Sequence, residues 1–205
     1  KIRFFQPFTS NMFGNTTKRK ISEKDQFSPL SIYALSKTSA FHICEFYKNV
    51  HKLKIYGAIF FNHESERRTP EYVTRKITQS VSRIFYKKQN KLFLGDLNSK
   101  IDWGYARDYV EAAYKLTQLR KPDVYVIGSG KSFSIKYFVK KCFEYVGLDY
   151  KKYVYVDKKL IRKNKNKTLV ADTSKAKKHF KFKNKTNIND LIKIMMENDL
   201  NIEKP

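Results

Sequence analysis

The sequence predicts an α/β fold with a largely parallel sheet and flanking helices. Two observations lead to this prediction. Short β-rich apolar runs alternate with segments of helical apolar periodicity, and the strand-like runs end in polar residues or glycine. With 205 residues, 41% of them hydrophobic and 15% aromatic, the chain can fold around a core in one or two domains. This composition excludes a disordered protein.

The first part of the chain contains two strand-like runs separated by a helical segment. Residues 2–8 are apolar and aromatic and end at Thr9, which predicts a buried strand. A polar loop over 14–27 leads to a helix over about 31–51. A second strand is expected at 54–61. The interior face of the helix is expected to consist of Tyr33, Ala34, Phe41, Ile43, Cys44 and Phe46.

The same alternation continues through the middle of the chain. A helix is expected over 72–86, because apolar residues recur there at spacings of three and four, and another over 105–119. Short strands are expected over 91–94 and 124–127. The second of these strands ends in the glycine-containing sequence 128–130.

Ser134 is expected to cap a helix that stops at Gly147, because serine favours helix starts and glycine favours helix ends. A strand at 151–156 and short helices near 174–180 and 188–198 complete the pattern. In a parallel α/β sheet, ligand sites lie beyond the carboxyl ends of the strands. In this chain those ends are Thr9 and Ser10, Asn62 and His63, and residues 128–130.

The chain has 43 basic and 19 acidic residues, a formal net charge of +24. Such a charge can attract nucleic acid or an anionic membrane. However, 34 of the basic residues are lysines scattered over nearly every segment, whereas phosphate and base recognition favours the planar fork of arginine. We therefore expect neither nucleic acid nor a membrane as the main partner, although the surplus charge favours anionic ligands such as nucleotide diphosphates.

Two cysteines, Cys44 and Cys142, lie far apart in helical patterns, which predicts reduced thiols and a cytoplasmic protein rather than a disulfide framework. No apolar run approaches the roughly 20 residues of a membrane helix, and no signal peptide is visible. We expect no metal site. Because the chain starts at Lys1 rather than Met and its first residues already form a predicted strand, we expect further residues to precede it.

Tyr33 and Lys37 would lie one turn apart on the same side of a helix. A neighbouring ammonium lowers the pKa of a phenol, which lets the phenolate act as a base near neutral pH. Tyr33 follows, after 24 residues, a strand that ends in Thr9. The same Tyr-x-x-x-Lys spacing recurs without that context at Tyr72 and Lys76, Tyr137 and Lys141, and Tyr155 and Lys159.

A dense group of polar residues follows the second strand, in the block Phe61-Asn-His-Glu-Ser-Glu-Arg-Arg68. With this block, nearly the whole chain resembles the C-terminal part, somewhat over half, of a GDP-mannose 4,6-dehydratase in the extended short-chain dehydrogenase superfamily. The block is far more specific to that family than the Tyr-x-x-x-Lys spacing. The matching stretches are residues 4–14, 31–37, 61–68, 72–78, 94–110 and 172–177.

The resemblance implies an incomplete Rossmann-like parallel sheet with flanking helices and a small C-terminal α/β substrate-binding region. Residues 1–130 would hold the C-terminal part of the catalytic domain with interleaved substrate-domain segments, and 131–205 mainly the substrate-binding subdomain. It also implies an NADP-dependent lyase of nucleotide-sugar metabolism that converts GDP-mannose to GDP-4-keto-6-deoxymannose, on the route to GDP-fucose. The family assembles as homodimers or tetramers.

The resemblance also implies roles for single residues. Tyr33 would take the proton of the sugar C4 hydroxyl, Thr9 would hydrogen-bond the C4 oxygen, and Lys37 would bind the nicotinamide ribose. The cofactor contacts would come from Tyr33, Lys37, His63 and Arg68. The substrate contacts would come from Asn62 and Arg162, the latter near the diphosphate.

The chain departs from the family in several places. It has no Gly-rich turn to hold the cofactor pyrophosphate. Asn11 stands where the family has a catalytic Glu, and a carboxamide cannot accept a proton near neutral pH. Ile101 replaces an Arg before Asp-Trp-Gly, and the segment 150–157 is shortened. We therefore expect a truncated and catalytically impaired dehydratase.

Two alternatives remain open at this point. In the first, the chain comes from another sugar-nucleotide epimerase or reductase, in which Asn11 is the adapted residue because epimerases manage without a carboxylate there. In the second, it is a non-catalytic protein whose basic surface binds an anionic partner.

Overall fold

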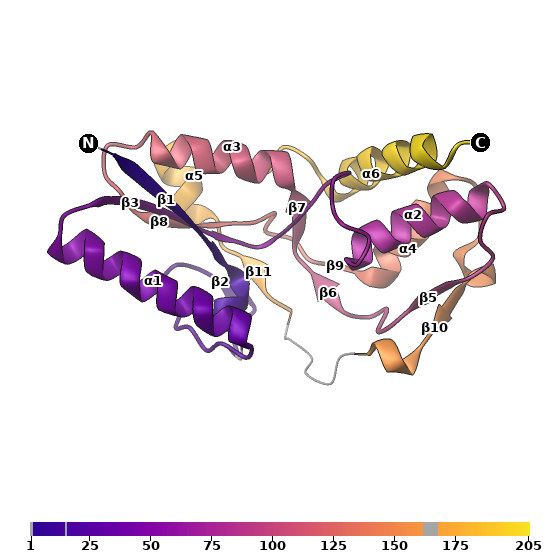
Figure 1. Cartoon of the computed structure of the whole chain (residues 1–205), viewed down its shortest axis with the longest axis horizontal. Helices are drawn as coiled ribbons and strands as arrows, with labels where there is room; N and C mark the ends of the chain where they lie inside the picture. Colours follow the sequence, from indigo (N-terminus) through magenta and orange to yellow (C-terminus); the bar gives the residue numbers. More distant parts are fainter. Residues whose placement is uncertain (1, 15, 162–167) are drawn as a thin grey trace. The chain divides into compact units, whose positions relative to one another are not determined.

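The computed structural model of the chain describes residues 2–14, 16–161 and 168–205. The chain forms two compact units, each built from three segments that alternate along the sequence (Figure 1). Unit 1 consists of Lys1–His63, Asp102–Ser132 and Asn166–Lys185. Unit 2 consists of Glu64–Ile101, Phe133–Lys165 and Thr186–Pro205. The assignment of domains to 1–130 and 131–205 stays a prediction.

Unit 1 is built around a parallel three-stranded sheet. Its strands are β1 (Arg3–Thr9), β3 (Lys54–Phe60) and β8 (Val124–Ile127), in the order β1-β3-β8. Thr9 pairs with Phe60, and Phe60 pairs with Ile127, so all three strands end at one edge of the sheet. This topology confirms the predicted α/β fold with a parallel sheet.

Helices cover both faces of this sheet, because successive strand residues point to opposite sides. Ile59 belongs to a buried cluster on the face covered by α1 (Ile32–Val50). Tyr56 and Ala58 belong to the cluster on the other face, which contains residues of α3 (Ala106–Thr117) and α5 (Ser174–Phe180). Figure 1 shows α1 on one side of the strands and α3 and α5 on the other.

The interior face expected for α1 is only partly right. Ala34 is buried, and Phe41 and Cys44 pack against the core. Tyr33, Ile43 and Phe46 were expected inside, but they are 53%, 56% and 54% exposed. The reason is that α1 has apolar residues on two sides, so periodicity alone cannot say which side meets the sheet. The apolar residues exposed on α1 are Ile32, Tyr33, Leu35, Ile43, Phe46, Tyr47 and Val50.

Unit 2 is built around three helices that pack against one another, α2 (Val73–Phe85), α4 (Ile135–Tyr145) and α6 (Ile188–Glu203). The Ser134 hydroxyl accepts a hydrogen bond from Tyr137 N and caps α4, as predicted. The residues that these helices bury include Ile77, Val81, Phe138, Val139, Cys142, Phe143, Leu191, Ile192, Met195 and Met196.

Short strands and turns complete the two units. In unit 2, β5 (Leu92–Leu94) pairs with β10 (Val154–Val156), and β6 (Lys100–Ile101) pairs with β9 (Phe133–Ser134). In unit 1, β2 (Lys20–Ile21) pairs with β11 (Val170–Ala171). The remaining elements are β4 (Asn62–Glu64), β7 (Trp103–Tyr105) and the 3-10 helices η1 (Ser10–Phe13), η2 (Tyr150–Lys152) and η3 (Lys158–Leu160).

Several element boundaries differ from expectation. The expected strand at 151–156 starts as η2 and becomes a strand only at Val154, and α6 continues to Glu203 rather than ending near 198. The expected polar loop at 14–27 contains β2. No helix in the described part of the chain is long and apolar enough to span a membrane.

Candidate active site at the carboxyl edge of the unit 1 sheet

Thr9 is the last residue of β1 and shapes the turn that follows it. Its side chain accepts a hydrogen bond from Asn11 N at 3.3 Å and caps η1, while Thr9 itself is only 8% exposed. The turn ends at Gly14, whose φ of +35° favours glycine and where a Cβ would lie 2.0 Å from the Ser28 carbonyl oxygen. The Thr9 hydroxyl is therefore fixed beside the end of the sheet.

Lys37 links α1 to the same strand. The Ser31 hydroxyl caps the helix by accepting a hydrogen bond from Ala34 N at 3.1 Å. One turn further along, Lys37 Nζ donates to the Pro7 carbonyl oxygen of β1 at 3.1 Å. Tyr33, one turn before Lys37, is 53% exposed and accessible to a ligand. The structure thus brings Lys37 to the strand that presents Thr9.

His63 lies just beyond β3, whose last residue, Phe60, pairs with Thr9. His63 Nδ1 lies 3.0 Å from the Phe61 carbonyl oxygen, which can only accept, so Nδ1 carries a proton. When the ring carries this single proton, Nε2 is the acceptor nitrogen. The rings of Phe60 and Tyr109 contact the imidazole with centroid separations of 5.5 Å and 5.4 Å and hold it in place.

The structure does not test the roles expected for the other contact residues. Asn62 and Asn11 are exposed, Asn62 in β4 and Asn11 in η1. Arg68 belongs to unit 2, where its Nε lies 3.3 Å from Glu64. Arg162 lies outside the described residues. The expected roles of these residues stay predictions.

Asp102 is a structural residue of this edge that sequence analysis did not single out. Its carboxylate is 1% exposed and accepts four hydrogen bonds, from Ser129 N at 2.9 Å, Ser129 Oγ at 2.6 Å, Gly130 N at 3.1 Å and Ala171 N at 2.9 Å. Burial raises the pKa of Asp102, and the four donors oppose that rise. From the sequence, Asp102 could be noticed only as the acidic residue of the Asp-Trp-Gly stretch. The sequence does not show which groups its carboxylate binds.

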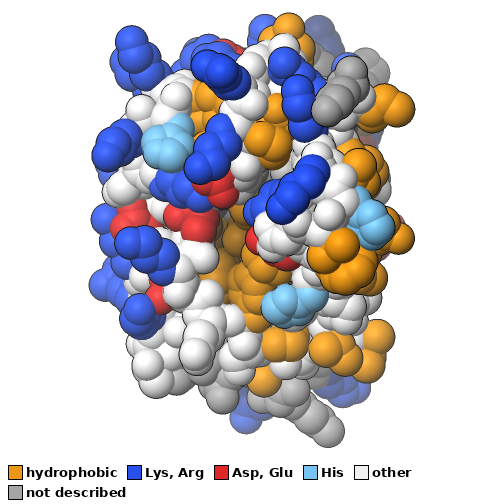
Figure 2. All heavy atoms as spheres, turned by 90° about the vertical axis from the view of Figure 1, so that its left-hand side faces the viewer, with side chains coloured by type: hydrophobic (Ala, Val, Ile, Leu, Met, Phe, Trp, Pro, Cys, Tyr) orange, Lys and Arg blue, Asp and Glu red, His pale blue; other side chains and the backbone are white. Residues whose placement is uncertain are grey.

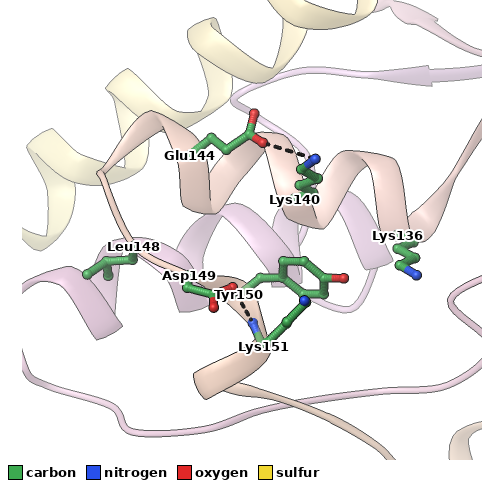
Figure 3. A pocket seen from close by; sticks show the side chains of 7 residues that line it. All are labelled: Lys136, Lys140, Glu144, Leu148, Asp149, Tyr150 and Lys151. Carbon is green, nitrogen blue, oxygen red and sulfur yellow. Dashed lines mark hydrogen bonds and ion pairs between the residues drawn. The ribbon is translucent and has the colours of Figure 1, made fainter.

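A separate surface pocket of about 580 Å³ lies in unit 2, on α4 and the turn that leads into η2 (Figure 3). Lys140 pairs there with Glu144 at 3.5 Å, and Lys151 N donates to Asp149 at 3.1 Å. None of the residues expected to act in catalysis lines it. Its lining residues are Lys136, Lys140, Glu144, Leu148, Asp149, Tyr150 and Lys151. In the part of the chain that the structure describes, no group of three or more His, Cys, Asp or Glu could hold a metal ion.

Several solved structures share the fold of this chain. RMD from Pseudomonas aeruginosa, complexed with NADPH, has a TM-score of 0.90 at 17% identity and is covered to 67%, with 98% of this chain aligned. The dTDP-glucose 4,6-dehydratase of Bacillus anthracis, in complex with NAD, has a TM-score of 0.84 at 19% identity, covering 96% of this chain and 61% of that one. At these identities the comparison shows the fold alone.

Sequence comparison is more specific. The GDP-mannose 4,6 dehydratase 1 of Arabidopsis thaliana is 41% identical over 99% of this chain, and the human GDP-mannose 4,6 dehydratase is 32% identical over 98%. The chain spans 56% and 59% of the length of these two relatives. A family model described as GDP-mannose 4,6 dehydratase matches residues 1–195. The chain therefore belongs to the GDP-mannose 4,6-dehydratase family.

Proposed function

We propose that this chain is the catalytic and substrate-binding part of an NADP-dependent lyase that converts GDP-mannose to GDP-4-keto-6-deoxymannose. The observation that carries the proposal is the arrangement at the end of β1 and β3. Thr9 ends one strand, His63 follows the other, and Lys37 is hydrogen-bonded to the strand of Thr9. The family match over residues 1–195 supports the choice of reaction and substrate.

Three residues of this edge have a definite task in the proposal. The Tyr33 phenolate takes the proton of the sugar C4 hydroxyl, and its 53% exposure leaves it open to the sugar. The Thr9 oxygen already accepts from Asn11 N, so its own proton is available for a hydrogen bond to the C4 oxygen. Lys37 stabilises the phenolate by its positive charge.

The cofactor contacts proposed at this edge come from α1. Tyr33 and Lys37 present a phenol and an ammonium one helical turn apart, which suits the nicotinamide ribose. When bound, NADP supplies a hydride acceptor and donor for the sugar carbons. The sequence has no Gly-rich turn, so the pyrophosphate would need donors that this chain does not supply in that form.

We also propose that the complete protein forms homo-oligomers and acts in the cytoplasm. The exposed apolar side chains of α1 provide a surface that another subunit can bury. The cysteines, Cys44 and Cys142, are both free, as expected in a reducing compartment.

The proposal can be tested by combining this chain with the part of a relative that the chain does not span. The 205-residue chain would be produced alone and together with the N-terminal part of the Arabidopsis dehydratase, and the formation of the 4-keto-6-deoxy sugar measured. We expect at most trace turnover alone and measurable turnover for the pair, which Tyr33→Phe should abolish. Turnover of the pair that survives Tyr33→Phe would contradict the proposed role of this edge.

A specific observation also supports a second function, that of a sugar-nucleotide epimerase or reductase. Asn11 is exposed in η1 and carries a carboxamide that cannot remove a C5 proton. Turnover of the reconstituted pair across a panel of sugar nucleotides separates the two functions. Loss of water from GDP-mannose favours the dehydratase, and C4 epimerisation without loss of water favours the alternative.

A further inference from the structure

Arg68 lies in the loop between β4 and α2, and neighbouring side chains of unit 2 control where its guanidinium lies. We propose that Glu64 and Tyr72 are positioning residues that hold Arg68 ready to bind a phosphate group of the cofactor. This inference rests on the proposed function and on the cofactor contact that the family resemblance implies for Arg68.

Glu64 contacts the arginine from one side. Arg68 Nε lies 3.3 Å from Glu64 Oε2, and the Thr74 hydroxyl donates to the same oxygen at 2.7 Å. Glu64 is only 4% exposed, so its carboxylate has little freedom to move. Thr74 lies in the first turn of α2, and therefore the position of the carboxylate is fixed by the helix.

Tyr72 covers the flat face of the guanidinium. Arg68 Cζ lies 3.3 Å from the centroid of the Tyr72 ring, well inside the range of a cation–π contact. The ring restricts the motion of the planar group on that face. Together with the ion pair between Nε and Glu64, this contact restricts the orientations open to the guanidinium.

The backbone at Arg68 is anchored as well. Arg75 Nη1 donates to the Arg68 carbonyl oxygen at 3.5 Å, and Arg75 Nη2 pairs with Asp199 of α6 at 2.8 Å. The Thr78 hydroxyl donates to the same Asp199 carboxylate at 2.6 Å. The loop that carries Arg68 is thus attached to two helices of unit 2.

These contacts leave the outer end of Arg68 available. Glu64 forms an ion pair at Nε, where no hydrogen bond is made within the described residues. The side chain stays 28% exposed. A guanidinium fork held in one plane matches two oxygens of a phosphate, and binding then costs little conformational entropy.

Glu64 has two opposing effects on an anion bound at Arg68, and Glu64→Gln separates them. Its negative charge repels the anion, whereas its contact with Nε holds the guanidinium still. Gln keeps an acceptor for the Thr74 hydroxyl but loses the charge. Electrostatics alone therefore predicts tighter anion binding in Glu64→Gln, and positioning predicts weaker binding.

The test uses the whole chain, with inorganic pyrophosphate as the probe. The NMR signal of the Arg68 side-chain Nε–H is assigned by its loss in Arg68→Lys, so that binding at the many lysines does not contribute. We expect pyrophosphate to shift this signal and Glu64→Gln to weaken the binding about three- to tenfold. Tyr72→Leu should weaken it about threefold, while the matched control Tyr72→Phe, which keeps the ring, should stay within about twofold.

Relaxation of the same signal gives a second readout. The Arg68 side chain should become more mobile in Glu64→Gln and Tyr72→Leu, at unchanged thermal stability. The inference is overturned if pyrophosphate does not shift the Arg68 signal. It is also overturned if Glu64→Gln binds pyrophosphate equally well or more tightly. Because pyrophosphate carries neither sugar nor nicotinamide, this result is independent of whether the reconstituted pair acts as a dehydratase.

Discussion

At the residue scale, the hydrogen bond from Lys37 to the Pro7 carbonyl oxygen connects the helix of Tyr33 to the strand of Thr9. Proline has no N–H, but its carbonyl remains a full acceptor. The bond therefore fixes α1 against β1 two residues before Thr9. The motif Tyr-x-x-x-Lys predicted the two helical residues, but it gave no indication that the ammonium would contact the strand.

Asn11 allows a prediction about chemistry. In the reconstituted pair, Asn11→Glu should raise the rate of water elimination at least about tenfold, because it supplies a carboxylate base next to Thr9. The measurement is the rate of 4-keto-6-deoxy sugar formation with GDP-mannose. Asn11→Gln is the matched control, since it has the length of Glu without its charge. If Asn11→Gln gains as much as Asn11→Glu, the gain does not come from a base.

Asp102 allows a prediction about stability. In Asp102→Asn, an NH₂ group must face N–H donors that now bind the carboxylate, so the free energy of unfolding should fall by about 2–4 kcal/mol. Urea denaturation measures this change. Asp149→Asn serves as the control, because Asp149 accepts from Lys151 N in the exposed η2 turn, and it should cost less than about 1 kcal/mol. Equal losses of unfolding free energy in both variants would show that the hydrogen bonds to Asp102 contribute no more to stability than a cap in an exposed turn.

At the element scale, α1 is the helix that sequence analysis placed least well. The helix itself was predicted from local chemistry, and the structure shows that Ser31 caps it. Its inward face was not predicted, because the inward-facing Phe41 and the outward-facing Phe46 are equally apolar. Which of them meets the sheet depends on the twist and spacing of β1 and β3, and these are set by long-range pairing.

The same limit applies to the shortest elements. The predicted strand at 124–127 has four buried residues in a row and was found with its bounds unchanged. In contrast, β2 and β11 have two residues each, which is too short for a periodic signal. They form because two segments of unit 1 that are far apart in the sequence pair with each other. The strand ends that define the candidate site were predictable, whereas the Asp102 junction beside them was not.

A pair of substitutions in α1 checks the orientation of this helix. Phe41 packs its ring against Phe8 and Phe27 with centroid separations of 5.2 Å and 4.8 Å, so Phe41→Ala should lower the free energy of unfolding by about 2–4 kcal/mol. Phe46 is 54% exposed, and Phe46→Ala should cost less than about 1 kcal/mol. Chemical denaturation of both variants gives the comparison. The reverse order would mean that the helix is rotated.

At the scale of the whole molecule, the main feature is the excess of positive charge. Lysine and arginine exceed aspartate and glutamate by 43 to 19. Figure 2 shows Lys and Arg side chains spread over the visible face, with hydrophobic side chains exposed among them. Most ion pairs of the described chain, such as Lys141 with Glu144, lie at the surface and contribute little to stability. The excess positive charge must therefore repel itself in the folded state.

This repulsion predicts a response to salt. Raising sodium chloride from about 0.02 M to about 0.5 M shortens the screening length several-fold, and the melting temperature should rise by several degrees. Differential scanning calorimetry measures the shift. An uncharged solute at equal osmolality should give a clearly smaller rise. If both additives act alike, charge repulsion is not what limits the stability of the chain.

The alternation of segments between the two units has a consequence for how this protein can change over generations. The backbone passes from one unit to the other five times, after residues 63, 101, 132, 165 and 185. A single deletion in the gene cannot remove one unit and leave the other whole. Both units must therefore be inherited together. A mutation that shortens one segment affects the unit that contains this segment and leaves the segments on either side of it, which belong to the other unit, unchanged.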